Sequence, residues 1–553
     1  MERLSRDRIL DLLPLALGAW VVWLVLGTWF ARLYYPFDLE WMEGGMLAHS
    51  WRLQQGLELY PAPEPDFIPF VYPPAYASIV AMLGWIFPLG YTLGRGVTCC
   101  GTLVAALAIV VGVDRNGGSA VVGCLAAAVF LGTYDDTGGF MDLVRPDTWH
   151  VALLAWSVVI GLEDRRGAPM ASGLLLAASF LFKHNAAAYG FPILLGIALR
   201  SGWRQGAIFG VSAGLPAVGV TLYMQWVSEG RFLAYLLAVP GSHPMLWQRG
   251  WPSGFAEIGM ALGLPMAACA AWLWLRTPSM SRVHLFVVVV IPGLLGVALA
   301  AYGYEMSAIS GVKLQPEWAR VGTFAALGVG IGCTGIIVSS WVWTRDVSWR
   351  LAYGVGIGFV GVLTAVLMRA HHGGFINVFL PVHWIIAFGV GIAMSRFRQE
   401  RPGWISSAAV AAVFSAQLGY FATHFEPVKY IPTQEDVEAG EMVVALVAEC
   451  EGPVHSPYAA WIPYQAGFEP SMHAIALWDV THKEGPFREF VNPLHDAARD
   501  HHWGCVVDGG TRPLGLSIPK YYETKVRFRI APNAMRPKTG WRARPTEILV
   551  PRE

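Results

Sequence analysis

A long succession of apolar segments is the feature that most constrains how this 553-residue chain can fold. Fourteen such segments follow one another over residues 1–424, and a helix needs about 20 mostly apolar residues to cross a bilayer. Charged residues are 47 of these 424, whereas they are 31 of the 129 in residues 425–553, a fraction typical of soluble proteins. We therefore predict a polytopic α-helical membrane domain (1–424) followed by one small soluble domain (425–553).

The sidedness of basic residues indicates which of the fourteen segments cross. Basic turns next to spanning helices favour the cytoplasmic side, and all of the short basic turns share the side of the N-terminus only if segment 74–90 does not cross. We therefore predict that 74–90 is a re-entrant or interfacial helix. Thirteen segments then span a bacterial inner membrane, with a cytoplasmic N-terminus and a periplasmic C-terminal domain. The alternative, an N-terminus outside, contradicts the basic residues Arg3, Arg6 and Arg8. The predicted spans are 10–31, 93–113, 118–134, 148–162, 168–182, 185–200, 205–227, 255–275, 283–302, 320–343, 351–368, 376–395 and 404–422.

With this topology, unusual ionisable residues gather on the outer face, where charges close to lipid mark a polar functional site. The first outer loop, 32–73, holds three acids within six residues, which is more than solubility requires. Further charged and polar residues lie in the second outer loop, at an outer hairpin and in the last outer loop. The candidates are Asp38, Glu40, Glu43, Asp142, Arg145, Asp147, Lys183, His184, Arg369, His371 and His372. Simpler interpretations stay open, since Lys183 could snorkel at the interface and the two histidines could form a turn without chemistry.

The soluble domain alternates helical and strand-like stretches, a pattern that favours a small α/β layer. We predict helices at 434–449, 458–466 and 487–500, and strands at 452–455, 472–477 and 504–507. Cys450 and Cys505 are the two cysteines of this domain, and in an oxidising compartment they could pair or each be buried alone. The chain has no nucleotide phosphate loop and no zinc-binding spacing. A net charge of zero and the lack of a basic run argue against nucleic acid as a partner.

Four motifs occur in a recognisable order on the predicted outer face. They are the acidic first loop, the Tyr72-Pro73-Pro74 segment that opens the 74–90 helix, Arg145 with Asp147, and Lys183. In this order the chain resembles the GT-C superfamily of membrane glycosyltransferases. It is most similar to the group of protein O-mannosyltransferases and lipid A aminoarabinose transferases, and more distantly to the oligosaccharyltransferase catalytic subunit.

The first loop departs from the usual pattern of that group, in which adjacent acids lie about fourteen residues before a glycine. Counting back from Gly56 gives Met42 and Glu43, whereas Asp38-Leu39-Glu40 fits a looser D-x-E form. The catalytic acid is therefore one of three. We favour Asp38 as the general base, then Glu43, and expect Glu40 to orient the acceptor or a metal.

The resemblance implies a glycosyltransferase that moves a sugar from a polyprenyl-phosphate donor to an acceptor hydroxyl. Such a reaction needs a carboxylate as general base and fixed cations for the leaving phosphate. For the donor we expect contacts from Tyr72, Arg145, Asp147, Lys183, His184, Arg369, His371 and His372. A divalent Mg²⁺ or Mn²⁺ is an optional cofactor, with Asp38, Glu40, Asp142 and Asp147 as its candidate ligands. Two alternatives remain, a secondary transporter and a non-catalytic lipid-binding protein, while the sugar and the acceptor stay open.

Overall fold

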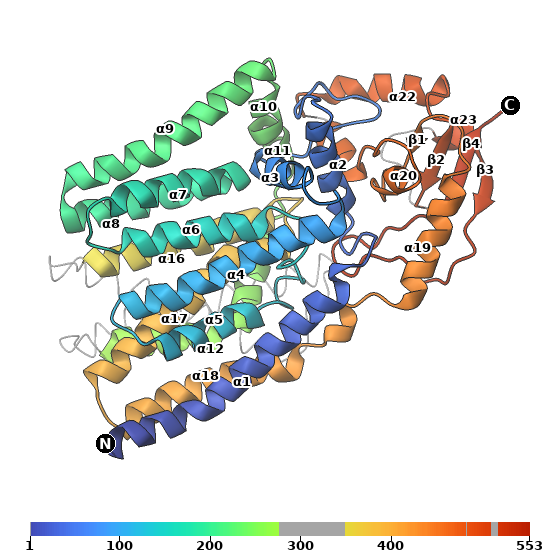
Figure 1. Cartoon of the computed structure of the whole chain (residues 1–553). Coiled ribbons are helices and arrows are strands. Elements are labelled where there is room, and N and C mark those ends of the chain that lie inside the picture. Colours follow the sequence, from blue (N-terminus) through green and yellow to red (C-terminus); the bar gives the residue numbers. More distant parts are fainter. Residues whose placement is uncertain (1, 276–348, 483, 510–517) are drawn as a thin grey trace.

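The computed structural model describes residues 2–275, 349–482, 484–509 and 518–553. Long helices lie side by side and form a bundle, and a smaller domain that contains the β-sheet lies beyond one end of it (Figure 1). The bundle helices are α1 (Glu2–Leu33), α4 (Tyr91–Arg115), α5 (Ala120–Gly132), α6 (Asp147–Gly161), α7 (Ala168–Phe182), α8 (Gly190–Ser201), α9 (Trp203–Val227), α12 (Phe255–Leu275), α16 (Trp349–Ala370), α17 (Leu380–Glu400) and α18 (Trp404–His424).

The chain is a multi-pass membrane protein by the length and apolar character of its helices. Seven helices in the described ranges are long and apolar enough to cross a bilayer, and they cover Ile9–Leu33, Tyr91–Arg115, Trp203–Val227, Arg249–Trp272, Tyr353–Ala370, Ile376–Glu400 and Trp404–His424. Four further predicted spans are helices of only 12 to 15 residues, α5 to α8. The predicted spans 283–302 and 320–343 lie outside the described residues, so the count of thirteen stays a prediction.

The segment 74–90 contains a helix that is too short to cross a bilayer. This helix, α3 (Ala75–Leu83), has nine residues and is about 14 Å long at 1.5 Å per residue, against about 30 Å of hydrocarbon. Trp85 and Ile86 follow it, and each is 75% exposed. A short helix that ends in exposed apolar side chains is what an interfacial segment requires.

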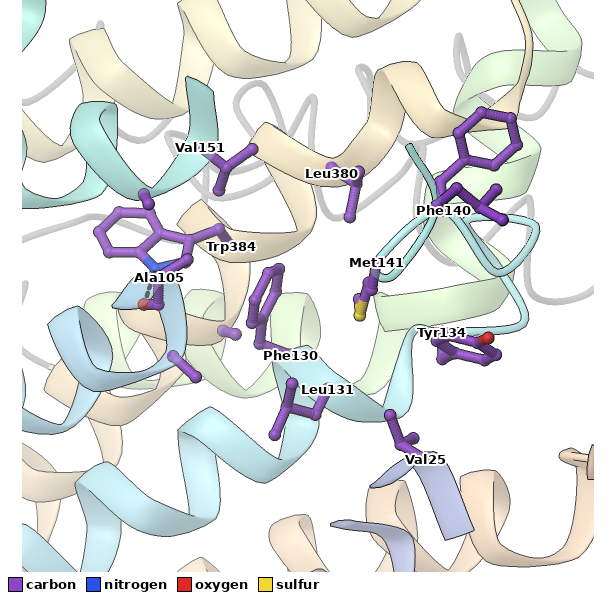
Figure 2. Close-up of a cluster of buried hydrophobic side chains, with 14 of the residues drawn as sticks. Val25, Ala105, Phe130, Leu131, Tyr134, Phe140, Met141, Val151, Leu380 and Trp384 are labelled. Atoms are coloured by element: carbon purple, nitrogen blue, oxygen red, sulfur yellow. Dashed lines mark hydrogen bonds between the residues drawn. The ribbon is translucent and has the colours of Figure 1, made fainter. Parts of the chain in front are cut away.

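Close packing of small and large side chains holds the bundle together. Phe130 and Leu131 of α5 lie among side chains from α4, α6 and α17 (Figure 2). In the same cluster the indole N–H of Trp384 donates a hydrogen bond of 2.8 Å to the carbonyl of Ala105. A Cβ at Gly112 would lie 2.7 Å from side chains of α6 and α17, so a glycine here lets three helices approach closely.

The C-terminal domain is a small α/β unit, as the sequence predicts. Its sheet has the order β1-β2-β4-β3, with β1 (Val454–His455) parallel to β2 (Cys505–Asp508). The strands β4 (Glu547–Pro551) and β3 (Tyr522–Arg527) add to it in antiparallel fashion. The helices are α19 (Gln434–Val447), α20 (Ile462–Gln465), α21 (Ala474–Val480), α22 (Val491–Arg499) and α23 (Ile518–Tyr521).

Two local predictions in this domain were wrong. The predicted strand 472–477 is largely helix α21, because the His473 side chain caps that helix by accepting a hydrogen bond of 3.1 Å from the Ile475 N–H. The predicted helix 458–466 is reduced to the single turn α20. Strands β3 and β4 were not predicted. The predictions of α19, α22, β1 and β2 agree with the structure within a few residues.

Cys450, just past the end of α19, and Cys505 of β2 form a disulfide with a Cα–Cα distance of 5.9 Å. The pairing that the sequence left open is therefore present.

We predict that replacing both cysteines, Cys450→Ser with Cys505→Ser, lowers the free energy of unfolding of this domain by roughly 3–4 kcal/mol. The reason is that the bond closes a loop with a sequence separation of 55. Pulse proteolysis of the full chain in urea, read at cleavage sites within 425–553, measures the change. The matched control replaces the exposed free cysteines Cys100 and Cys124. Equal midpoints for the two double variants would contradict the prediction.

Candidate active site

A cavity of about 390 Å³ lies where the loops of the membrane domain meet the C-terminal domain. Its walls come from five separate loops of the membrane domain and three segments of the C-terminal domain. The polar and aromatic residues that line it are Glu40, Trp41, Phe70, Tyr72, Phe140, Arg145, Lys183, His184, Asn185, His243, Arg249, His371, His372, Phe375, Asn377, Tyr458, Trp478, Asp479 and Trp541. Most of the predicted donor-site residues are thus brought together, although they are spread over more than 300 positions of sequence.

Glu40 is the first-loop acid that faces this cavity. It lies between α1 and helix α2 (Glu43–Gln54), and its side chain is 2% exposed. One carboxylate oxygen accepts a hydrogen bond of 3.2 Å from the Met42 N–H and lies 3.5 Å from a guanidinium nitrogen of Arg145. Burial raises the pKa of Glu40 to about 7, although Arg145 favours the charged form. A carboxyl group that titrates near neutral pH is suited to proton transfer.

Asp38, the acid that the sequence favoured as general base, does not line the cavity. Its carboxylate accepts hydrogen bonds of 2.8 Å from the Gly44 N–H and 3.0 Å from the Tyr91 hydroxyl. Burial, together with the negative charge of Glu43, raises the pKa of Asp38 well above its usual range. The expectation that Asp38 stays ionised and accessible is therefore not supported.

Glu43 is also turned away from the cavity and forms a buried ion pair with Arg95 of α4. Their two contacts measure 3.0 and 2.8 Å, and both side chains are fully buried. The same carboxylate accepts hydrogen bonds from the N–H groups of Leu39 at 2.7 Å and Val144 at 2.9 Å. Burial opposes the charge of Glu43, but the Arg95 guanidinium outweighs it and lowers the pKa of Glu43. Glu43 therefore joins the loop 32–73 to the loop 135–147.

The loop 135–147 contributes one acid that supports the fold, Asp142, and one that holds a cation, Asp147. Asp142 pairs at 2.7 Å with the buried Arg32 at the end of α1 and accepts a hydrogen bond from the Tyr134 hydroxyl. Asp147 accepts hydrogen bonds of 2.6 Å from Lys183 and 2.8 Å from the Asn377 amide. Asp147 thus fixes Lys183 in the wall of the cavity.

Arg145 completes a line of alternating charges. Its guanidinium lies 3.5 Å from Glu40 and 3.8 Å from Asp147, and it donates a hydrogen bond of 2.8 Å to the Tyr72 hydroxyl. The four charged side chains are therefore neighbours in the order Glu40, Arg145, Asp147 and Lys183. Arg145 is held on both sides by carboxylates, whereas Lys183 has a carboxylate on one side and the cavity on the other.

Arg369, expected as the arginine of a phosphate clamp, lies outside the cavity lining. Both arms of its guanidinium pair with Glu257, at 2.9 and 2.8 Å, and it also donates to the Gly374 carbonyl. Arg369 therefore supports the turn that carries His371 and His372. Besides Arg145, the cavity wall holds Arg249, which donates to the carbonyls of His372 and Gly374. Within the described ranges none of the hydrogen bonds or ion pairs of Arg249 is to a carboxylate.

The residues proposed as metal ligands do not fit a shared ion. Asp38, Asp142 and Asp147 are each held by other partners, namely Tyr91, Arg32 and Lys183. Only Glu40 of the four faces the cavity. In the part of the chain that the structure describes, no three His, Cys, Asp or Glu side chains are grouped so that they could hold a metal ion.

Sequence reasoning missed Arg95, Arg249 and the aromatic residues Tyr458, Trp478 and Trp541 of the cavity wall. Arg95 carried a signal, since it is a charged residue inside a predicted span, where an ionisable side chain needs a partner. Arg249 lies in a Trp/Pro/Gly-rich loop at 228–254, with no acidic residue next to it to mark it as part of a site.

We predict that Glu43→Gln destabilises the protein by about 3–5 kcal/mol, because it leaves the Arg95 guanidinium buried and unpaired. The double variant Glu43→Leu with Arg95→Met should recover part of the loss. Thermal unfolding in detergent measures both. Glu163→Gln, which removes the partner of the half-exposed Arg115, is the control and should change the midpoint little. A Glu43→Gln protein as stable as wild type would refute the structural role.

No protein-family model and no curated protein matches the chain. Among solved structures, it is similar to two crystal structures of ArnT from Cupriavidus metallidurans. The one bound to undecaprenyl phosphate is 14% identical with a TM-score of 0.47, over 96% of this chain and 97% of that chain. The apo structure is 15% identical with a TM-score of 0.46, over 97% of this chain and 98% of that chain. Likeness at this level leaves the function to be argued from the residues of this chain.

Proposed function

We propose that the chain is a membrane glycosyltransferase that moves a sugar from a polyprenyl-phosphate donor to an acceptor hydroxyl at the outer face of the membrane. One observation carries the proposal: a carboxyl group with a pKa near 7, Glu40, shares a cavity with the cations Lys183 and Arg249. A proton acceptor and fixed positive charges are the two things that transfer from a sugar phosphate demands.

The cations serve the donor phosphate. When the bond between the anomeric carbon and the phosphate oxygen breaks, negative charge develops on that oxygen, and charge-assisted hydrogen bonds stabilise it. Lys183 offers a point charge, whereas Arg249 offers a planar fork that can bind two phosphate oxygens. His184, next to Lys183, and His371 and His372, on the turn that Arg249 holds, also line the cavity. They supply further donors around the same phosphate.

Glu40 serves as general base in place of Asp38. The acceptor oxygen attacks the anomeric carbon, its proton passes to the Glu40 carboxylate, and the electron pair of the broken C–O bond leaves with the lipid phosphate. Arg145, 3.5 Å from Glu40, orients the carboxylate and favours its ionised form. The sugar passes through an oxocarbenium-like state, as in glycoside hydrolysis.

The position of α3 supports a donor that is a lipid. Tyr72 lines the cavity, and α3 begins three residues later and leads to the exposed apolar side chains Trp85 and Ile86. The cavity wall is thus directly continuous with a segment suited to the membrane surface. A secondary transporter would instead place its ionisable residues near the bilayer midplane, between broken helices.

We predict that Glu40→Gln lowers the transfer rate by about 10²–10⁴-fold while binding of a polyprenyl phosphate and the melting temperature stay near wild type. Because the base must be deprotonated and burial raises its pKa to about 7, the wild-type rate should rise with pH up to about 7 and then level. Release of polyprenyl phosphate from a sugar-linked donor measures the rate. Glu58→Gln, at a partly exposed position of the same loop, is the control. Full activity of Glu40→Gln would remove the first loop from the reaction.

A further inference from the structure

The two sides of the cavity differ in chemistry. The membrane domain contributes the cations Lys183 and Arg249, whereas the C-terminal domain contributes mostly aromatic and apolar side chains, among them Tyr458, Trp478 and Trp541. The carboxyl group on that side, Asp479, has a pKa that burial raises well above its usual range. The donor phosphate is therefore attracted to the side of the membrane domain, and a ligand of low charge fits the side of the C-terminal domain.

A segment near the C-terminus places one of these aromatic residues, Trp541, next to the proposed base, Glu40. The N–H of Lys538 donates a hydrogen bond of 2.8 Å to the Leu39 carbonyl, and Thr539 pairs with Glu40 in a parallel bridge. Gly540 follows with a φ of +73°, and a Cβ there would lie 2.8 Å from a Glu40 carboxylate oxygen. Only glycine can adopt this φ and also approach the carboxylate this closely without strain. The carboxylate of Glu40 and the backbone of Gly540 are thus in direct contact.

Trp41 follows Glu40 and Trp541 follows Gly540, and the two indole rings lie close together. The rings of Trp41 and Trp541 have centroids 5.2 Å apart. Trp41 is buried, whereas Trp541 is 50% exposed and lines the cavity. An indole that is packed on one buried ring and still half exposed is held in place yet open to a ligand. The base and this open aromatic surface therefore lie next to each other.

A sugar ring suits such a surface better than a peptide strand does. The faces of a pyranose carry C–H groups that pack on a flat aromatic ring, while its hydroxyls point outward from the edge of the ring and stay free to react. Trp and Tyr offer large rigid contact area with a polar edge. A peptide acceptor that adds to a strand edge would be recognised through main-chain hydrogen bonds, and indole faces do not supply these.

We propose that the acceptor is a carbohydrate, whose ring packs on Trp541 and presents one hydroxyl to Glu40. This inference rests on the proposed function and names its acceptor class. In the transfer step the proton of that hydroxyl goes to Glu40, a new glycosidic bond forms to the donor sugar, and the polyprenyl phosphate leaves with the electron pair. The C-terminal domain thereby supplies acceptor recognition, and the membrane domain supplies donor recognition and the base.

The test uses the full chain in lipid nanodiscs and saturation-transfer NMR. The probes are the methyl glycosides of glucose, galactose, mannose and N-acetylglucosamine, and, as the competing class, the peptide acetyl-Ala-Ser-Ala-amide. We expect transfer to the ring protons of at least one glycoside and none to the peptide. Trp541→Ala should weaken glycoside binding about tenfold, on the scale of a lost aromatic contact, and Trp541→Tyr should retain most of it. Trp404→Ala removes an exposed indole from a membrane helix and should have no effect.

Binding of a polyprenyl monophosphate, measured on the same samples, separates this inference from the proposed function. Trp541→Ala should bind the lipid phosphate as wild type does. Binding of the peptide instead of any glycoside, no transfer to any glycoside, or glycoside binding that survives Trp541→Ala would overturn the carbohydrate acceptor and leave the donor site standing. A wild-type chain that fails to bind the lipid phosphate would instead overturn the proposed function.

Discussion

The buried ion pair between Arg95 and Glu43 determines how the loops around the cavity are arranged. Arg95 lies in a membrane helix, where a charge is costly unless it is fully paired. Its guanidinium meets the Glu43 carboxylate and also donates to the carbonyls of Arg32, Tyr35 and Phe37. The chain leaving α1 is therefore wrapped around one cation. Because the Glu43 carboxylate in turn accepts hydrogen bonds from the N–H groups of Leu39 and Val144, the loops 32–73 and 135–147 are fixed relative to each other.

This arrangement gives three neighbouring acids three different surroundings. Asp38 faces the Tyr91 hydroxyl, Glu43 faces Arg95, and Glu40, between them in sequence, faces the cavity. Burial raises the pKa values of Asp38 and Glu40, whereas Arg95 lowers that of Glu43. Environment sets the protonation of each carboxyl group, and only Glu40 combines access to the cavity with a pKa near 7.

The sequence alone predicted the features that depend on local pattern. The apolar runs located the membrane helices, and alternation located α19 and β2, whereas the pairing of the two cysteines of the C-terminal domain stayed open until the structure showed it. The misassigned residues depend on partners that are distant in sequence. Arg369 pairs with Glu257, more than 100 residues away in sequence, and therefore lies outside the cavity lining. The strand-like run at 472–477 becomes helical through the His473 cap, and that side chain is held by the carbonyl of Trp41, 432 positions earlier.

Backbone contacts join the C-terminal domain to the proposed base, and the two domains therefore form the walls of one cavity. Thr539 and Gly540 lie against Glu40, and Lys538 pairs at 2.8 Å with Asp436 at the start of α19.

The most direct test of the proposed site is a cryo-electron microscopy structure of the full chain with bound polyprenyl phosphate. We expect the phosphate inside the cavity, in contact with Lys183 and Arg249 and on the same side as Glu40. A phosphate bound elsewhere, with the cavity between the two domains empty, would contradict it.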